Sequence, residues 1–159
     1  LKLNGKEIGT TPVKKYRAIF KVPYQPGTLT AEALDGNGNV LSFHSLVSAS
    51  EETVLTVKPE KKVLRANGQD LCYLPIEFAD KAGNLKPFVE QRVEIAVSLA
   101  GFGSALCKTA EVFDKNYHNS YRGRMLAVLR VGNAPGKATV TVRSVGMEPI
   151  TVEVNVNDI

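Results

Sequence analysis

The stretch that decides the fold is Thr151-Val152-Glu153-Val154-Asn155-Val156, in which polar and apolar side chains alternate without a break. A period of two is typical of a strand that packs one face on a core and leaves the other in water. The same alternation returns in segments 17–22, 93–98 and 139–143. No window shows a convincing period of 3.6, and the best helical candidate, 105–113, is short and poorly amphipathic. The sequence therefore predicts an all-β protein.

Composition and charge limit the classes of function. The chain has 159 residues, of which 43% are hydrophobic and 23% are charged, so it can bury a core in one or two domains. The net charge of +4 is small, and the densest basic spots are only the pairs at 14–15 and 61–62, so no nucleic-acid partner is expected. No apolar run approaches the roughly 18 residues of a membrane helix, so no membrane span is expected.

The residue types that bind metals do not gather at ligand spacing. Cys72 and Cys107 are expected to be lone buried or half-buried thiols instead of two halves of one bridge. His44 and His118 have no Cys, Asp or Glu at ligand spacing. If Phe43 faces the core, the alternation of its strand turns His44 toward solvent. Neither a metal nor a cofactor is expected.

Two polar segments, 35–39 and 80–84, are predicted to be tight turns. Each opens with an Asp that can cap the turn and ends in a Gly-Asn pair that tolerates a left-handed conformation. Segment 35–39 resembles the start of a calcium loop, but Val40 stands where glycine is required and Leu46 where a bidentate Glu is required. The first segment is therefore interpreted as a hairpin turn.

The chain carries no recognisable catalytic motif. It contains no nucleophile elbow of the G-x-S-x-G type, no phosphate-binding loop and no dinucleotide fingerprint. Glycoside hydrolysis needs two carboxylates held roughly 5 to 9 Å apart on a rigid frame. The acids here lie mostly in turns or at outward strand positions, such as Glu77, Glu94 and Glu153. By itself the chain is not expected to be an enzyme.

A weak internal repeat divides the chain. A strand, a Pro-Gly turn, a strand, a tight turn and a strand follow one another twice, once within 17–47 and once within 124–156. This order predicts two tandem immunoglobulin-like β-sandwich modules, 1–52 and 53–159, each ending in the same three-strand meander. The small polar segment 48–52 is the expected joint between them.

The two predicted modules are unequal in length. The second has the size of an immunoglobulin-like sandwich, whereas the first is too short for seven strands and is expected to be truncated at its N-terminus. The opening at Leu1, inside a strand-like segment, favours a piece excised from a larger polypeptide. Such a module would have a raw sheet edge, and a tag, a neighbouring module or self-association with a second copy would cover it.

The connection over 101–123 is unusually long for a compact domain, and long connections are often functional. Its Tyr rings and neighbouring polar groups could stack on a sugar or dock against a partner domain. Alternatively, Phe102 and Phe113 pin this connection to its own sandwich. The candidate carbohydrate or interdomain contact residues are Asp114, Asn116, Tyr117, His118, Tyr121 and Arg122.

Motifs in both modules carry a family resemblance. In the second module these are Asn67-Gly68-Gln69-Asp70-Leu71, Gly101-Phe102-Gly103-Ser104-Ala105 and Tyr121-Arg122-Gly123-Arg124-Met125-Leu126-Ala127-Val128. Together they resemble the C-terminal immunoglobulin-like domain of family 2 glycoside hydrolases. The first module, with Leu1-Lys2-Leu3-Asn4-Gly5 and Tyr16-Arg17-Ala18-Ile19-Phe20, is similar to the small domain that precedes it in these enzymes.

The resemblance implies a non-catalytic accessory region of a β-galactosidase-like enzyme. Such an enzyme uses two Glu residues on a (β/α)₈ barrel with retention of configuration, and no position of this chain matches that barrel. The leading hypothesis is therefore a pair of accessory modules that pack against the catalytic barrel of a secreted or periplasmic enzyme, where 101–123 approaches the rim of the active site.

Two other hypotheses come from different classes of protein. One is an autonomous carbohydrate-binding module that uses Asp114, Tyr117, Tyr121 and Arg122. The other is a bacterial surface adhesin, in which tandem immunoglobulin-like modules also occur.

Overall fold

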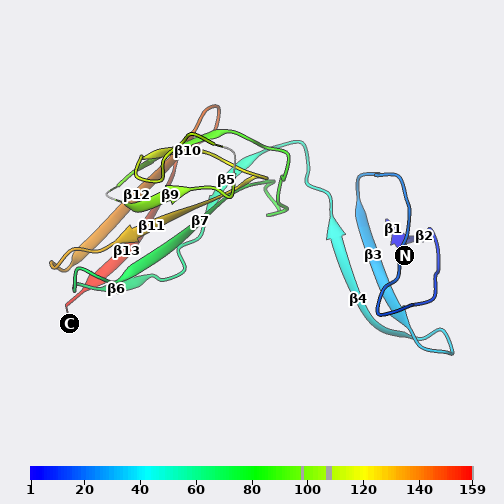
Figure 1. The fold of residues 1–159 in the computed structure, drawn as a ribbon. Helices are drawn as coiled ribbons and strands as arrows, with labels where there is room; N and C mark the ends of the chain where they lie inside the picture. Colours follow the sequence, from blue (N-terminus) through cyan, green and yellow to red (C-terminus); the bar gives the residue numbers. More distant parts are fainter. Residues whose placement is uncertain (98, 107–108, 159) are drawn as a thin grey trace. The chain divides into compact units, whose positions relative to one another are not determined.

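The chain is described from a computed structural model, which covers residues 1–97, 99–106 and 109–158. Every regular element in the described residues is a β-strand, and the strands form three sheets, so the prediction of an all-β protein is confirmed. The chain divides into two compact units, Leu1–Ser48 and Ala49–Ile159, called the N-terminal and C-terminal units below (Figure 1).

The N-terminal unit contains one four-stranded antiparallel sheet. Its strand order is β2-β1-β3-β4, and the strands are Lys6–Glu7, Lys2–Leu3, Thr28–Leu34 and Val40–Val47 respectively. The β3–β4 hairpin is its main element, because β1 and β2 have only two residues each. The strands β2 and β4 lie at the edges of this sheet, and the covering of a raw edge by a tag, a neighbouring module or a second copy stays a prediction.

Two expectations for this unit are wrong within the described residues. Segment 17–22 forms no strand, because no strand lies beside it to take its backbone hydrogen bonds; only an isolated bridge joins Lys14 to Arg17. The unit also has a single sheet where a two-layer sandwich was expected. With no second layer, Phe43 does not face a core, and both Phe43 and His44 are exposed.

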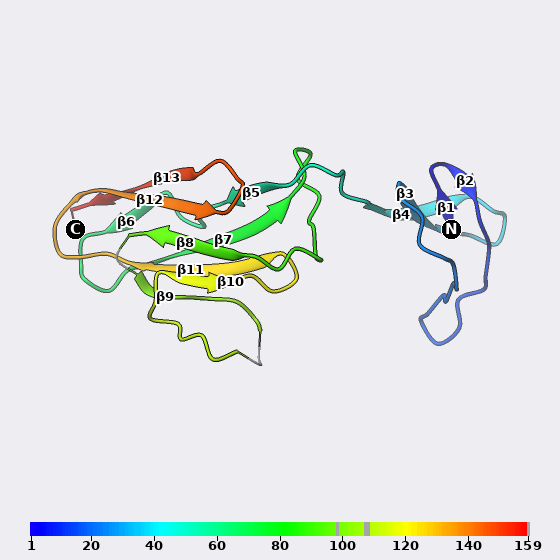
Figure 2. The same ribbon diagram turned by 90° about the horizontal axis from the view of Figure 1, so that it is seen from above.

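The C-terminal unit is a sandwich of two sheets (Figure 2). One sheet has the order β10-β8-β12-β13-β6, with strands Tyr117–Asn119, Arg92–Ala96, Gly136–Ser144, Ile150–Asn157 and Val63–Arg65. The other has the order β5-β7-β11-β9, with strands Val54–Val57, Leu71–Ala79, Arg124–Arg130 and Leu99–Gly103. All pairings are antiparallel except that of β13 with β6.

Alternation of side chains builds the core between these sheets. Every second residue of β8 and of the middle of β7 is buried, and the residues between them are more exposed. Burying one large aliphatic or aromatic side chain stabilises a fold by about 1.5–3 kcal/mol, so this inward set dominates the stability of the unit. The most deeply buried side chains include Leu64, Cys72, Leu74, Ile76, Phe78, Val93, Ile95, Phe102, Val140, Val142 and Val154. Cys72 is a free, buried thiol, as predicted, whereas Cys107 lies outside the described residues.

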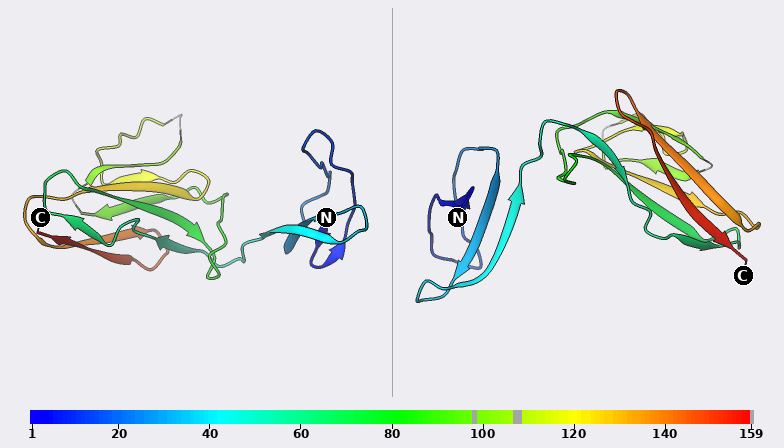
Figure 3. Two further views of the ribbon diagram at one scale, coloured as in Figure 1. Left: turned by 90° about the horizontal axis from the view of Figure 1, so that it is seen from below. Right: turned by 180° about the vertical axis from the view of Figure 1, so that it is seen from behind.

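The predicted three-strand meander is only partly present. The strands β12 and β13 pair over seven residues and run side by side in Figure 1 and in the right-hand view of Figure 3. However, β11 belongs to the opposite sheet, so the chain changes layer at the Pro135-Gly136 turn. The two units therefore share a hairpin that follows a Pro-Gly turn, namely β3–β4 and β12–β13, and not a complete meander.

The two predicted Asp-initiated turns are confirmed and have the same hydrogen bonds. The Oδ1 atom of Asp35 accepts from the Asn39 backbone N–H at 2.8 Å, and its Oδ2 accepts from Asn39 Nδ2 at 2.9 Å. In the second turn Asp80 receives the same two bonds from Asn84, also at 2.8 and 2.9 Å. These amides favour the ionised carboxylate.

Two buried or half-buried side chains fasten the joint segment to the C-terminal unit. The backbone N–H of Ser50 donates to Asp80 Oδ2 at 2.9 Å. The ammonium group of Lys86 donates to the Glu51 carbonyl oxygen at 2.6 Å and to Thr53 Oγ1 at 2.8 Å. Residues 50–53 are therefore part of this unit and not a free linker.

Candidate functional site

The segment 101–123, which was expected to be one long connection, contributes residues to two edge strands. In β9, Phe102 pairs with Ala127 of β11. In β10, His118 pairs with Val93 of β8. These strands lie in opposite sheets, so the segment closes one side of the sandwich, and residues 109–116 run outside the sheets in Figure 2.

His118 lies in the core and is removed from the predicted contact residues. Its side chain is 0% exposed, so it offers no surface to a sugar or to another domain. The ring stacks on Phe113, with centroids 5.7 Å apart, and meets the edge of Phe102 at 6.5 Å. Nδ1 lies 2.9 Å from the Asn119 carbonyl oxygen, and Nε2 has no hydrogen-bond partner among the described residues.

Glu111 ties the irregular part of the segment to β10. Its carboxylate accepts from the Asn119 backbone N–H at 3.0 Å and from Asn119 Nδ2 at 2.9 Å, and it lies 3.2 Å from His118 Nδ1. The backbone N–H of Phe102 donates to the Phe113 carbonyl oxygen at 2.8 Å. Packing of Phe102 and Phe113 against the sandwich, one of the alternatives from the sequence, is thus what the structure shows.

The turn 121–124 presents Arg122 at the end of the sandwich. Arg122 has a φ of 50° and Gly123 a φ of 72°, and a bridge joins Tyr121 to Arg124. The left-handed region costs a non-glycine residue about 1 kcal/mol or more. A Cβ atom on Gly123 would strike the carbonyl oxygen of Lys86, so this position needs glycine for space as well as for φ. The guanidinium of Arg122 lies 5.5 Å from the centre of the Tyr121 ring.

The other candidate residues are dispersed. Asp114 and Asn116 are exposed in the irregular segment. One face of the Tyr117 ring already holds the guanidinium of Arg92, at 3.8 Å from its centre, so that face is not free for a sugar. A ligand or interdomain contact at Asp114, Asn116, Tyr117, Tyr121 and Arg122 stays a prediction.

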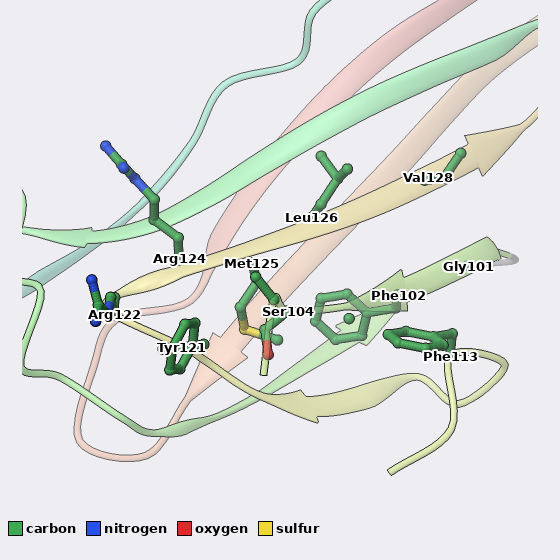
Figure 4. A pocket seen from close by; sticks show the side chains of 12 residues that line it. Gly101, Phe102, Ser104, Phe113, Tyr121, Arg122, Arg124, Met125, Leu126 and Val128 are labelled. Atoms are coloured by element: carbon green, nitrogen blue, oxygen red, sulfur yellow. The ribbon is translucent and has the colours of Figure 1, made fainter. Parts of the chain in front are cut away.

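A hollow of the C-terminal unit lies beside β9 and β11. This hollow, called the groove below, has a volume of about 700 Å³ and an almost wholly apolar lining (Figure 4). Its lining includes Gly101, Gly103, Phe113, Tyr121, Leu126 and Val128. Of the predicted contact residues, only Tyr121 and Arg122 line it.

Two glycines of β9 line the groove, and the Phe113 ring fills the space above one of them. Gly103 pairs with Leu126, and Gly101 pairs with Val128. A Cβ atom on Gly103 would run into the Phe113 ring, which therefore lies directly over this glycine. The sequence analysis missed Leu126 and Val128, although the unbroken apolar run 125–129 departs from the alternation of a half-buried strand.

Other chemistry finds little support in the described residues. No group of three or more His, Cys, Asp or Glu side chains among them could hold a metal ion. No helix in that part of the chain is long and apolar enough to cross a membrane. The pKa of the Asp80 carboxyl is held well below its ordinary value, mainly by the Asn84 side-chain amide and then by the Ser50 backbone N–H. Since these bonds fix a turn and the joint segment, the shift at Asp80 is structural.

Two family models match the chain in tandem. The model described as glycoside hydrolase family 2 C-terminal domain 5 matches residues 55–153, more than half of the chain. A domain of unknown function, DUF4982, matches residues 1–42. The first match includes strands of both sheets of the C-terminal unit and all residues that line the groove.

Similar proteins agree with these matches. The β-galactosidase BoGH2A of Bacteroides ovatus is 26% identical over 163 residues, which are 99% of this chain and 19% of that protein. A family 2 glycosyl hydrolase structure from Bacteroides cellulosilyticus is 25% identical with a TM-score of 0.91, over 96% of this chain and 22% of that one. A β-glycosidase from Bacteroides vulgatus has the same fold, with a TM-score of 0.85 at 20% identity over 97% of this chain and 20% of that one.

The chain thus spans about a fifth of the length of the relatives that it matches. The resemblance inferred from the glycine and aromatic motifs is confirmed, and the matched region is the non-catalytic C-terminal part of these hydrolases. This chain belongs to the C-terminal domains of glycoside hydrolase family 2.

Proposed function

We propose that this chain is an accessory region of a retaining β-galactosidase, in which it packs against the catalytic barrel and supports the enzyme without taking part in bond cleavage. The observation that carries the proposal is the match of 99% of the chain to 19% of a β-galactosidase, together with the family model over 55–153. A region that is aligned over its whole length but makes up a fifth of the relative is suited to a supporting role.

The carboxylates of the chain support a non-catalytic role. Glu77 pairs with Arg124 at 2.9 Å, Glu94 with Arg92 at 3.4 Å, and Glu153 with Lys137 at 2.9 Å. These pairs lie on the outer faces of the sheets, where glutamates serve solubility and pairing. The general acid and the nucleophile of a retaining glycosidase would instead face one another across a sugar, about 5 Å apart.

An activity assay tests the proposal directly. The 159-residue chain should release no nitrophenol from p-nitrophenyl β-galactoside, whereas the full-length polypeptide that carries it should. Removal of the region from that polypeptide should leave measurable hydrolysis but lower its thermal midpoint, because packed surface becomes exposed. Turnover by the isolated chain at enzyme-like rates would refute the proposal, and so would an unchanged midpoint after the deletion.

We propose that Tyr121 and Arg122 lie near the rim of the active site in the full-length enzyme. In the full-length enzyme, Tyr121→Ala and Arg122→Ala should raise KM while kcat changes little, since the two side chains would touch bound substrate away from the reacting atoms. Thr139→Ala, on the outer face of the opposite sheet, is the matched control. Identical KM values in all three variants would place the turn 121–124 away from the rim.

The proposed location is the periplasm or the cell exterior, as the family resemblance implies. Fractionation of cells that express the full-length gene, with antibody detection of the chain, tests this location. A purely cytoplasmic signal would contradict it.

A further inference from the structure

The outer faces of the C-terminal sandwich differ in polarity. On the sheet that contains β12 and β13, the outer face is polar: Thr141 and Thr151 share a hydroxyl hydrogen bond of 3.1 Å, and Lys137 pairs with Glu153. That pattern is normal for an antiparallel sheet with one side in water. This face needs no partner.

The middle of the outer face of the other sheet is apolar, and the Arg124–Glu77 ion pair lies at one end of this apolar part. In β7 and β11, Tyr73 lies opposite Val128, and Pro75 lies opposite Leu126. The side chains of Tyr73 and Leu126 are each 41% exposed. This apolar face consists of Tyr73, Pro75, Leu126 and Val128, and the groove continues it over Gly101 and Gly103 of β9.

The groove also has anchoring features that a partner surface could use. The Phe113 ring stands beside it and is 58% exposed, although it stacks on the buried His118. Arg122 lies at the end of the groove, and no carboxylate of the described residues lies within ion-pair distance of it. A contiguous exposed apolar patch with an aromatic residue and an arginine at its margin is characteristic of a protein interface.

We propose that the apolar face and the groove together form the docking surface for the rest of a family 2 glycosidase chain. This inference rests on the proposed function and names the surface that performs it. The occupant is inferred from the family: C-terminal domains of these hydrolases pack with the remainder of their enzyme, and about four-fifths of the matched relative lies outside the region aligned with this chain. The docked segment has apolar side chains that fill the groove.

A sugar is the less suitable occupant. Binding of a sugar requires polar groups that match its hydroxyls, whereas the surface that lines the groove is almost wholly apolar, although Ser104, Arg122 and Arg124 are among its residues. Arg124, which also lines the groove, is already paired with Glu77. The groove can exclude water from an apolar protein segment but offers few partners for a ring of hydroxyls.

Hydroxyl-radical footprinting of the full-length enzyme and of the isolated 159-residue chain tests the docking surface. Oxidation of Tyr73, Phe113 and Leu126 should be several-fold slower in the full-length enzyme. The peptide that contains β13, on the polar face, should be oxidised at the same rate in both. Galactose added to the isolated chain should protect none of these residues.

A pair of matched variants strengthens this test. Leu126→Lys places a charge on the apolar face, and Thr139→Lys places the same charge on the polar face. In the isolated chain, both should keep the thermal midpoint of the parent, which shows that both fold. In the full-length enzyme, Leu126→Lys alone should restore fast oxidation of Tyr73 and speed release of the region by protease.

The outcomes separate this inference from the proposed function. If the full-length enzyme slows oxidation of the polar face but not of Tyr73 and Leu126, the proposed docking surface is wrong. The region would then still pack on its enzyme, but through its other face. Equal oxidation of every peptide in both samples would overturn the proposed function as well, because the region would then pack on nothing. Protection of the isolated chain by galactose would make the groove a sugar site and would also overturn the inference.

Discussion

The contact between Gly103 and the Phe113 ring yields a quantitative prediction. A Cβ atom on Gly103 would overlap this ring, whereas the nearest atom to a Cβ on Gly101 is the Phe113 carbonyl oxygen at 3.8 Å, an ordinary contact. Overpacking costs about 1–3 kcal/mol where neighbours cannot move. If the ring swings away instead, the stack on His118 is lost, which costs about 0.5–1.5 kcal/mol. Gly103→Ala should therefore lower the free energy of unfolding by about 1–3 kcal/mol.

Gly101→Ala is the matched control on the same strand. It meets no obstacle and restricts the unfolded chain, so it should be neutral or stabilise by up to about 1 kcal/mol. The assay is urea unfolding of residues 49–159, the C-terminal unit with its own core, followed by circular dichroism. The two substitutions add the same methyl group two residues apart, so their difference reports the contact with the ring.

A double-mutant cycle makes the reasoning refutable. In a Phe113→Ala background the ring is gone and the nearest remaining atom is His118 Cδ2 at 3.6 Å, an ordinary contact, so Gly103→Ala should cost little there. The coupling free energy between the two sites should then be about 1–3 kcal/mol in magnitude, in the range seen for residues in contact. Equal effects of Gly103→Ala in both backgrounds, or equal effects of Gly101→Ala and Gly103→Ala, would show that the ring does not lie over this glycine.

Two further predictions concern the joint between the units. The pKa of Asp80 is lowered in the folded state by Asn84, so its contribution to stability is complete above the unfolded value near 4 and is lost as the pH falls through the lower folded value. The urea midpoint of residues 49–159 should fall below pH 4, and Asp80→Asn should flatten this dependence; an equally steep decline would show that other carboxyls cause it. Lys86→Met removes the hydrogen bonds from the Lys86 ammonium group to the segment 50–53. Proteases that do not cleave after lysine, of the chymotrypsin and subtilisin types, should therefore cut this segment faster, as measured by mass spectrometry. Lys62→Met is the control, and equal cleavage in both variants would show that Lys86 does not hold the segment 50–53 in place.

Strict alternation identified the strands of the polar-faced sheet correctly. Val140 and Val142 face inward while Thr139 and Thr141 face outward, so the sequence states which side of the strand is buried. One strand is enough to identify its buried side, because the alternation of polar and apolar residues is a property of the local sequence. Segment 17–22 shows its limit: the alternation is equally good, but a strand also needs a partner for its backbone, and none lies beside it in the described residues.

The candidate site was less accessible to sequence analysis, because it depends on register between distant segments. Gly101 and Gly103 argue against a strand by propensity, so 101–123 was expected to be a connection. Their role becomes visible only when β9 lies against β11, where each glycine stands opposite a large apolar residue. His118 was assigned to the surface for the same reason, since three residues of β10 are too few to show alternation.

The run Met125-Leu126-Ala127-Val128-Leu129 nevertheless contains a local signal for the docking surface. In a two-layer sandwich, a strand needs apolar side chains only toward the core, as β13 shows with Glu153 and Asn155 on its outer side. In β11 the side chains of Met125, Ala127 and Leu129 are buried in the core, whereas Leu126 and Val128 lie on the outer side and do not contribute to it. An apolar residue at an outward position loses favourable free energy in water unless something covers it. The middle of β11, which is apolar on both sides, is therefore the local sequence feature that supports the proposed docking surface.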